Sequence, residues 1–204
     1  MELPRDWSSF ALLSIDVQND FWSDEQSRQF PDFAQKTQNL LGFCRSEGIE
    51  VVHIRAQFNP DGSDWMVRYR LTEDIPCIEG TPGAAPLNCA IEIPGEKVFT
   101  KQTFDAFQMP DLQRYLTQQG TRFLLCAGLV TGVCVFLTSA SAAQRGYLTA
   151  LVTDCCADEP SKHAATLESY PFIFENVTLL QLPSAFERWS QQLRSLENLS
   201  ADPV

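Results

Sequence analysis

Along this chain, short runs of almost only apolar residues alternate with segments in which apolar residues recur at helical spacing. The apolar runs are typical of strands buried on both faces of a parallel sheet, and the periodic segments indicate helices that cover such a sheet. The strands predicted are 10–16, 50–58, 97–100, 122–127, 148–153 and 177–180, and the helices predicted are 33–47, 110–119, 132–145, 161–169 and 183–196.

Strands that alternate with helices predict an α/β fold with helices on both sides of the sheet. A chain of 204 residues is the size of one domain. We therefore expect a single-domain, three-layer α/β/α sandwich with a mostly parallel, doubly wound sheet, and a frayed tail after about residue 197.

The segment 59–96 interrupts this alternation. It contains the turn-rich sequences "NPDG", "IPCIEGTPG" and "EIPGE", and also the aromatic and basic stretch "DWMVRYRL". A connection of this length inside a compact domain is usually functional or disordered, and its aromatic content favours order. We expect this excursion to determine substrate specificity.

Charge and composition narrow the classes of partner. The formal net charge is −11, and no run of Lys or Arg forms a basic stripe, which argues against nucleic acid and anionic membranes. The N-terminal sequence does not resemble a signal peptide, and no apolar run approaches the length of a membrane span. The seven cysteines are an odd number without the spacing of a disulfide framework, and together with the absence of an export signal they favour a reducing, cytoplasmic location. A small-molecule substrate is the partner we expect.

Three reactive side chains lie at the predicted carboxyl ends of strands, where open α/β sheets bind their ligands. Asp16 ends the first strand, Lys101 follows the third, and Cys134 follows the strand 122–127 across a tight turn. Taken one by one, the acid is often a turn former, the lysine a solvated surface group and the cysteine a small core residue. Their agreement with one geometry favours a common site.

The chemistry of these groups is that of nucleophilic catalysis. A helix N-terminus and a nearby ammonium group are expected to favour the thiolate of Cys134, which is the nucleophilic form. The Asp16 carboxylate would carry the proton between the thiol and a leaving amine. Backbone N–H groups of the turn would hold the oxyanion, and one such donor typically stabilises the transition state by ~3–4 kcal/mol.

Four blocks of the sequence, "LLSIDVQNDF", "GTPGAAPL", "VFTKQTFDAF" and "AGLVTGVCVFLTSASAAQRGY", resemble in order the signature segments of the isochorismatase-like cysteine hydrolases. That superfamily includes nicotinamidases, N-carbamoylsarcosine amidase, and biuret and ureidoacrylate hydrolases. The resemblance implies a catalytic triad of Asp16, Lys101 and Cys134, and a cis peptide at Leu129–Val130. It also implies an oxyanion hole formed by the backbone amides of Val130 and Cys134, and a homo-oligomer, either a dimer or a tetramer.

The substrate-binding candidates follow from the same blocks. Gln18 and Phe21 come after Asp16, and Phe104 and Phe107 come after Lys101, so that their side chains are candidates to wall a small apolar pocket. Arg55, near the excursion, is a candidate to clamp a substrate carboxylate. Core packing for the aromatic residues, and a solvated or subunit-interface position for the arginine, remain the alternatives.

The resemblance does not extend to the metal site of nicotinamidases, which have an Asp-x-His sequence and a further His after the second strand. The corresponding region here reads "HIRAQFNPDG", and His53 has no second histidine nearby. A strand histidine packed against a helix is the simpler interpretation. We therefore expect no metal ion and no cofactor.

Taken together, the sequence predicts a hydrolase that cleaves a C–N bond in a small amide, ureido or carbamoyl substrate through a thioester. One alternative is vinyl-ether hydrolysis of the isochorismatase type, which does not depend on the thiol. The other is a non-catalytic α/β binding module. The presence of Cys134 favours the first interpretation, and the absence of G-x-G-x-x-G and Walker A patterns argues against nucleotide binding.

Overall fold

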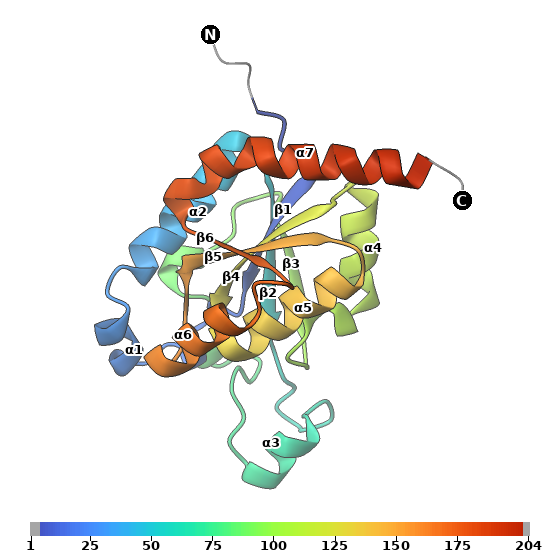
Figure 1. Cartoon of the computed structure of the whole chain (residues 1–204). Coiled ribbons are helices and arrows are strands. Elements are labelled where there is room, and N and C mark those ends of the chain that lie inside the picture. Colours follow the sequence, from blue (N-terminus) through green and yellow to red (C-terminus); the bar gives the residue numbers. More distant parts are fainter. Residues whose placement is uncertain (1–4, 202–204) are drawn as a thin grey trace.

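The computed structural model describes residues 5–201 and contains one six-stranded parallel sheet in the order β3-β2-β1-β4-β5-β6 (Figure 1). The strands are β1 (Phe10–Ile15), β2 (Glu50–Ala56), β3 (Lys97–Lys101), β4 (Phe123–Leu129), β5 (Leu148–Ala157) and β6 (Glu175–Val177). The α-helices are α1 (Asp24–Gln29), α2 (Phe33–Glu47), α3 (Val67–Thr72), α4 (Pro110–Gln118), α5 (Phe136–Gln144), α6 (Pro160–Ser169) and α7 (Leu182–Ala201).

The helices form two layers, with α2 and α7 on one face of the sheet and α4, α5 and α6 on the other (Figure 1). This doubly wound arrangement confirms the predicted α/β/α sandwich. Strand order reverses between β1 and β4. The crevice outside the carboxyl ends of these two strands is therefore the expected ligand site of the fold.

The central strands are apolar because they are covered on both faces. Every residue of β1 and every residue of β4 is buried. Aromatic rings at the amino ends of these strands join them to α7: Phe10 stacks on Phe123 at 4.9 Å between ring centroids, and Phe123 lies 4.6 Å from Trp189. Burial of side chains of this size typically stabilises the fold by ~1.5–3 kcal/mol each.

Most predicted elements are present with small shifts at their ends. Helix α2 has the predicted bounds and ends at Gly48, whose φ of 71° closes the helix in the left-handed conformation. The last strand lies earlier than predicted, at Glu175–Val177, because residues 179–181 form a helical turn instead. The final helix extends to Ala201, beyond the expected start of a frayed tail.

Two short helices were not predicted. Helix α1 lies in the connection after β1, and α3 lies within the excursion and projects away from the body of the molecule (Figure 1). Ala56, Phe58 and Cys77 form a small second apolar cluster at the base of the excursion. This cluster explains why a segment rich in turn sequences is nevertheless ordered.

The connection after β1 fastens the excursion to the sheet. The Gln18 side chain donates to the carbonyls of Ala56 and Ala84 and accepts a hydrogen bond from the Ala56 N–H, each at 2.8 Å. The Asp20 carboxylate accepts a hydrogen bond from the Cys77 N–H at 2.6 Å. These hydrogen bonds fix the part of the excursion that lies against the sheet, while α3 projects away from the body of the molecule (Figure 1).

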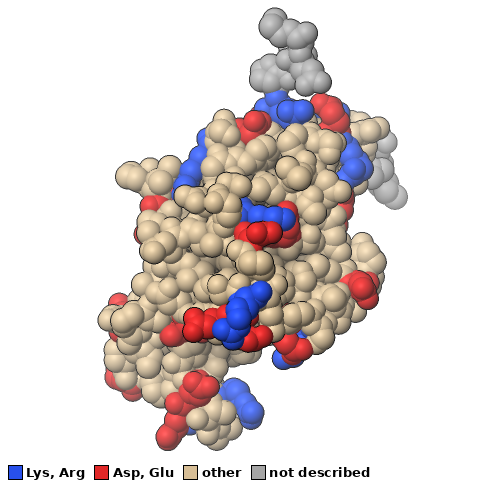
Figure 2. All heavy atoms as spheres, turned by 90° about the vertical axis from the view of Figure 1, so that its left-hand side faces the viewer, with Lys and Arg blue, Asp and Glu red and all other residues tan. Residues whose placement is uncertain are grey.

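The surface shows acidic and basic side chains interspersed. On the face in Figure 2, Lys and Arg side chains lie beside Asp and Glu rather than gathering in one broad basic patch. Within residues 5–201, none of the helices has both the length and the apolar composition needed to cross a membrane.

Candidate active site

Asp16, Lys101 and Cys134 meet at the carboxyl ends of the strands beside the point where strand order reverses. The Lys101 Nζ atom lies 2.7 Å from Asp16 Oδ2 and 3.6 Å from Cys134 Sγ, and it donates to the Thr103 carbonyl at 2.8 Å. Lys101 ends the edge strand β3, and its long side chain extends across the end of β2 to reach Asp16. The sequence therefore identified three residues that the fold does bring together.

The acid and the amine form a fully buried ion pair, with exposed fractions of 0% for the Asp16 side chain and 1% for Lys101. Burial raises the pKa of Asp16, and the Lys101 ammonium opposes this change. Burial acts to lower the pKa of Lys101, but the charges of Asp16 and Cys134 outweigh it and the Lys101 pKa is raised. The second carboxylate oxygen, Asp16 Oδ1, has no hydrogen-bond partner within residues 5–201. This oxygen is free to accept a proton.

The state of the thiol differs from the sequence-based expectation. Burial, and then the Asp16 carboxylate, raise the pKa of Cys134 well above that of a free cysteine, although Lys101 opposes the change. Cys134 is 94% buried, and the loss of water on burial outweighs the effect of the ammonium group. At neutral pH the side chain rests as a thiol beside a carboxylate, so that proton transfer has to accompany nucleophilic attack.

Cys134 lies in a turn of π-helix, Thr131–Val135, which leads into α5. The peptide bond between Leu129 and Val130 is cis, at the position that the resemblance implies. Before this turn, Gly128 has a φ of 130°, and an added Cβ atom would lie 1.9 Å from the Ile15 carbonyl oxygen. Only glycine allows β4 to approach β1 this closely, and this approach sets Cys134 beside Asp16.

Two side chains from the region after β5 brace the cysteine turn. The Thr131 hydroxyl and His163 Nδ1 share a hydrogen bond of 2.8 Å, and the Gly132 N–H donates to Asp158 Oδ2, also at 2.8 Å. The Thr131 hydroxyl therefore holds the turn by hydrogen bonding. The sequence gave no sign of the contribution of His163, because the two residues lie 32 positions apart.

A cavity of about 190 Å³ opens in front of the triad. Cys134 and Lys101 lie at its sheet side, and α3 contributes to the opposite side. A cavity of this size restricts a ligand to a small molecule. The apolar part of the lining consists largely of Phe21, Phe58, Met66, Phe104, Val130 and Val133.

Of the five substrate-binding candidates, Phe21 and Phe104 line this cavity and the other three do not. Gln18 is buried and fastens the excursion, as described above. Arg55 pairs with Glu92 in a short ion pair. Phe107 is buried and lies under the guanidinium of Arg145, 5.2 Å from the ring centroid. For these three, the partners that occupy the side chain are distant in sequence and could not be read from the motifs.

His53 is part of a hydrogen-bonded network with Glu96 and Arg45. Its Nε2 atom lies 3.0 Å from Glu96 Oε2, and Arg45 binds the same carboxylate at 2.8 and 3.0 Å. Burial lowers the pKa of His53, although Glu96 opposes the change. Across residues 5–201, no cluster of three or more His, Cys, Asp and Glu side chains is placed to hold a metal ion.

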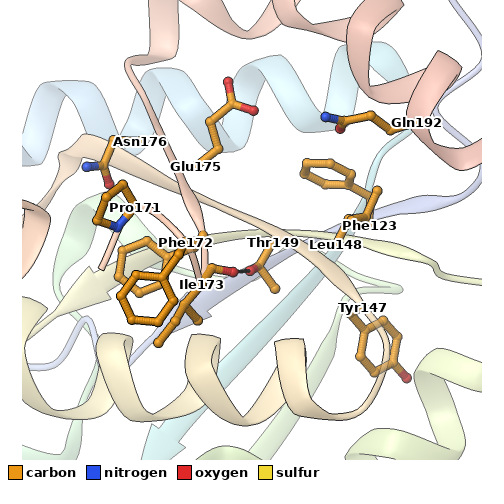
Figure 3. Close-up of a pocket in the computed structure, with 11 residues that line it drawn as sticks. Phe123, Tyr147, Leu148, Thr149, Pro171, Phe172, Ile173, Glu175, Asn176 and Gln192 are labelled. Atoms are coloured by element: carbon orange, nitrogen blue, oxygen red, sulfur yellow. Dashed lines mark hydrogen bonds between the residues drawn. The ribbon is translucent and has the colours of Figure 1, made fainter. Parts of the chain in front are cut away.

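A larger hollow of about 470 Å³ lies at the opposite edge of the sheet (Figure 3). Its lining comes from the beginnings of β4 and β5, from β6 and from α7, and it includes Phe172 and Tyr147. Its one acidic lining residue, Glu175, already pairs with Arg188 and accepts a hydrogen bond from Trp189 at 2.8 Å. The smaller cavity, and not this one, contains the reactive groups.

Comparison with known proteins gives a consistent assignment. The model of the isochorismatase domain matches residues 10–180. An uncharacterized isochorismatase family protein of Bacillus subtilis, YddQ, is 30% identical over 149 residues, which cover 72% of this chain and 77% of that protein. A probable inactive nicotinamidase of Arabidopsis thaliana is 26% identical over 197 residues, covering 92% and 97% of the two chains.

Solved structures share the fold. An isochorismatase family protein of Desulfovibrio vulgaris superposes with a TM-score of 0.80 at 27% identity, covering 88% of this chain and 98% of that one. The N-carbamoylsarcosine amidase of Thermoplasma acidophilum has a TM-score of 0.70 at 20% identity, with coverage of 83% and 96%. At that identity, the second likeness supports the fold alone.

Proposed function

Because the chain belongs to the isochorismatase family, we propose that it is a cysteine-dependent amidohydrolase that cleaves a C–N bond in a small amide, ureido or carbamoyl compound. The observation that carries this proposal is the buried cluster of Asp16, Lys101 and Cys134 at the wall of a small cavity. Amide hydrolysis is also the reaction named for the N-carbamoylsarcosine amidase whose fold this chain shares.

In the proposed reaction, Cys134 Sγ attacks the carbonyl carbon of the substrate while the thiol proton passes to the Asp16 carboxylate. The raised pKa of Asp16 suits this step, because a stronger base takes the proton more readily. Asp16 then donates the proton to the leaving nitrogen, and ammonia or an amine departs to leave a thioester. Water attacks the thioester next, releases the acid and restores the thiol.

Lys101 and the backbone of the turn would stabilise the charges that appear on this path. The ammonium group lies within 3.6 Å of the sulfur and 2.7 Å of the carboxylate, so it stabilises either as an anion. The amides of Val130 and Cys134 are the proposed donors to the oxyanion, since both residues line the cavity.

The test is ammonia release from a panel of small amides, ureido compounds and carbamoyl compounds. We expect turnover by the wild-type chain and none by Cys134→Ala or Cys134→Ser. Cys89→Ala is the matched control, because Cys89 is a partly buried cysteine outside the cavity. Hydrolysis of isochorismate that survives in Cys134→Ala would instead support the vinyl-ether mechanism. A wild-type chain without activity on any of these substrates would support a non-catalytic module.

A further inference from the structure

The walls of the cavity in front of Cys134 offer a substrate little besides apolar surface. Four aromatic side chains line it, namely Phe21, Phe58, Tyr69 and Phe104, and the excursion supplies one of them, Tyr69. Rings of this kind accommodate a flat or branched apolar body. A polar group on the substrate, other than the scissile amide, therefore needs a specific partner.

Among residues 5–201, the lining of the cavity contains no unpaired cation. Its basic residue, Lys101, is fully engaged with Asp16, Thr103 and Cys134. Of the arginines in or beside the excursion, Arg55 pairs with Glu92 and Arg70 donates to backbone carbonyls of its own loop, while Arg68 is exposed and is not part of the lining. A substrate carboxylate would lose its water here without gaining a partner, so the geometry disfavours anionic substrates.

The half-buried side chain of Tyr69 brings a hydroxyl to this largely apolar wall. The ring lines the cavity, and within residues 5–201 the hydroxyl has no protein hydrogen-bond partner. The ring is held edge-on by Phe58 at 5.3 Å and by Phe104 at 6.3 Å between centroids. Burial, and then the negative charges of Cys134 and Asp16, raise the pKa of Tyr69 to about 12, so the phenol stays protonated at neutral pH.

We propose that Tyr69 is a specificity-determining residue whose hydroxyl hydrogen-bonds a neutral polar atom on the body of the substrate, and that the substrate is a small, uncharged carboxamide with an aromatic or branched body. This inference rests on the proposed function, because it places the scissile carbonyl at Cys134. Helix α3, which lies outside the sheet, would then position the Tyr69 hydroxyl for this contact with the substrate.

The experiment measures binding, so that it does not depend on turnover. Full-length Cys134→Ala protein is titrated with benzamide and with the three pyridine carboxamides, which match benzamide in shape and add a ring nitrogen that accepts a hydrogen bond. The same titrations are repeated with Tyr69→Phe in that background. Tyr147→Phe is the matched control, because Tyr147 lines the hollow at the opposite edge of the sheet (Figure 3).

We expect Tyr69→Phe to weaken binding of the best pyridine carboxamide by about 2- to 10-fold, the range of one net hydrogen bond. Benzamide should bind equally to both proteins, and Tyr147→Phe should change neither ligand. An amide that carries a carboxylate, such as succinamate, should bind at least about 10-fold more weakly than the neutral amides.

Equal weakening for benzamide and its pyridine analogues would overturn the proposal, because it would indicate a structural role for the ring. An unchanged affinity in Tyr69→Phe, tighter binding of succinamate, or no binding of any neutral amide would overturn it as well. Binding of neutral amides without ammonia release by the wild-type chain would contradict the proposed catalysis and leave the role of Tyr69 intact.

Discussion

Removing the ammonium group from the buried ion pair gives the sharpest prediction about the site. Both side chains of the pair are almost completely buried, so in Lys101→Met the Asp16 carboxylate loses its counter-charge in a buried site. Breaking a buried pair from one side typically costs about 3–5 kcal/mol. We expect a loss of that size in the free energy of unfolding at pH 8.

The loss should depend on pH in a defined direction. Without Lys101, the folded-state pKa of Asp16 rises further above its unfolded value of ~3.9. Between these two values the folded state binds more protons than the unfolded state, so the stability of the variant falls as pH increases. The slope is at most about 1.4 kcal/mol per pH unit for one proton. The destabilisation should therefore be smaller at pH 5 than at pH 8.

Urea unfolding followed by tryptophan fluorescence at both pH values measures these quantities. The double variant Asp16→Asn, Lys101→Met removes both charges, and we expect it to be more stable than Lys101→Met alone at pH 8. A double-mutant cycle then gives the coupling energy of the pair. Additive losses for the two single variants, with no difference between pH 5 and pH 8, would refute the description of Asp16 and Lys101 as a desolvated ion pair.

Further predictions concern the parts of the fold that hold the site. Gly128→Ala should destabilise the fold by more than about 3 kcal/mol, because its Cβ atom would overlap the Ile15 carbonyl. Gly146 has a φ of 88° and open space around it, so Gly146→Ala should cost only about 1–2 kcal/mol. Similar losses in the two variants would count against a steric requirement at Gly128. Burial acts to raise the pKa of Glu96, but hydrogen bonds from Arg45, the Ile93 N–H and His53 lower it to about 2. The ionised Glu96 should therefore stabilise the fold by about 3 kcal/mol, and this stabilisation should be lost as pH falls from about 4.5 to 2. Glu96→Gln should remove this pH dependence from acid unfolding curves. Thr131→Val should lower kcat and Thr131→Ser should restore it, since serine keeps the hydroxyl that bonds His163; equal rates in the two variants would contradict a positioning role.

The sequence was sufficient to predict the sheet and the three side chains that meet at the candidate site, because both depend on local signals. Buried parallel strands appear as continuous apolar runs, and the rule that ligands bind at their carboxyl ends selects Asp16 and Cys134 without further information. Lys101 follows the same rule. The prediction that Lys101 pairs with Asp16, 85 positions away, nevertheless needed the family resemblance as well as the rule about strand ends.

What the sequence could not show depends on partners that are distant along the chain. Arg55 was a reasonable candidate for a substrate clamp until the fold placed Glu92 against it, 37 positions away. The resting state of Cys134 was misjudged for a similar reason. The helix terminus and Lys101 can be read from the sequence, but the extent of burial, which decides the pKa here, follows from the packing of the cysteine turn and its surroundings.

The central claim is that Cys134 forms a thioester with the substrate, and intact mass spectrometry tests it directly. A hydrolysed amide from the panel is mixed with the wild-type chain, and the reaction is quenched in acid during turnover. We predict that the protein gains the mass of the acyl group and that peptide mapping places it on Cys134. Sustained ammonia release by Cys134→Ala, with no adduct on the wild-type chain, would contradict the account.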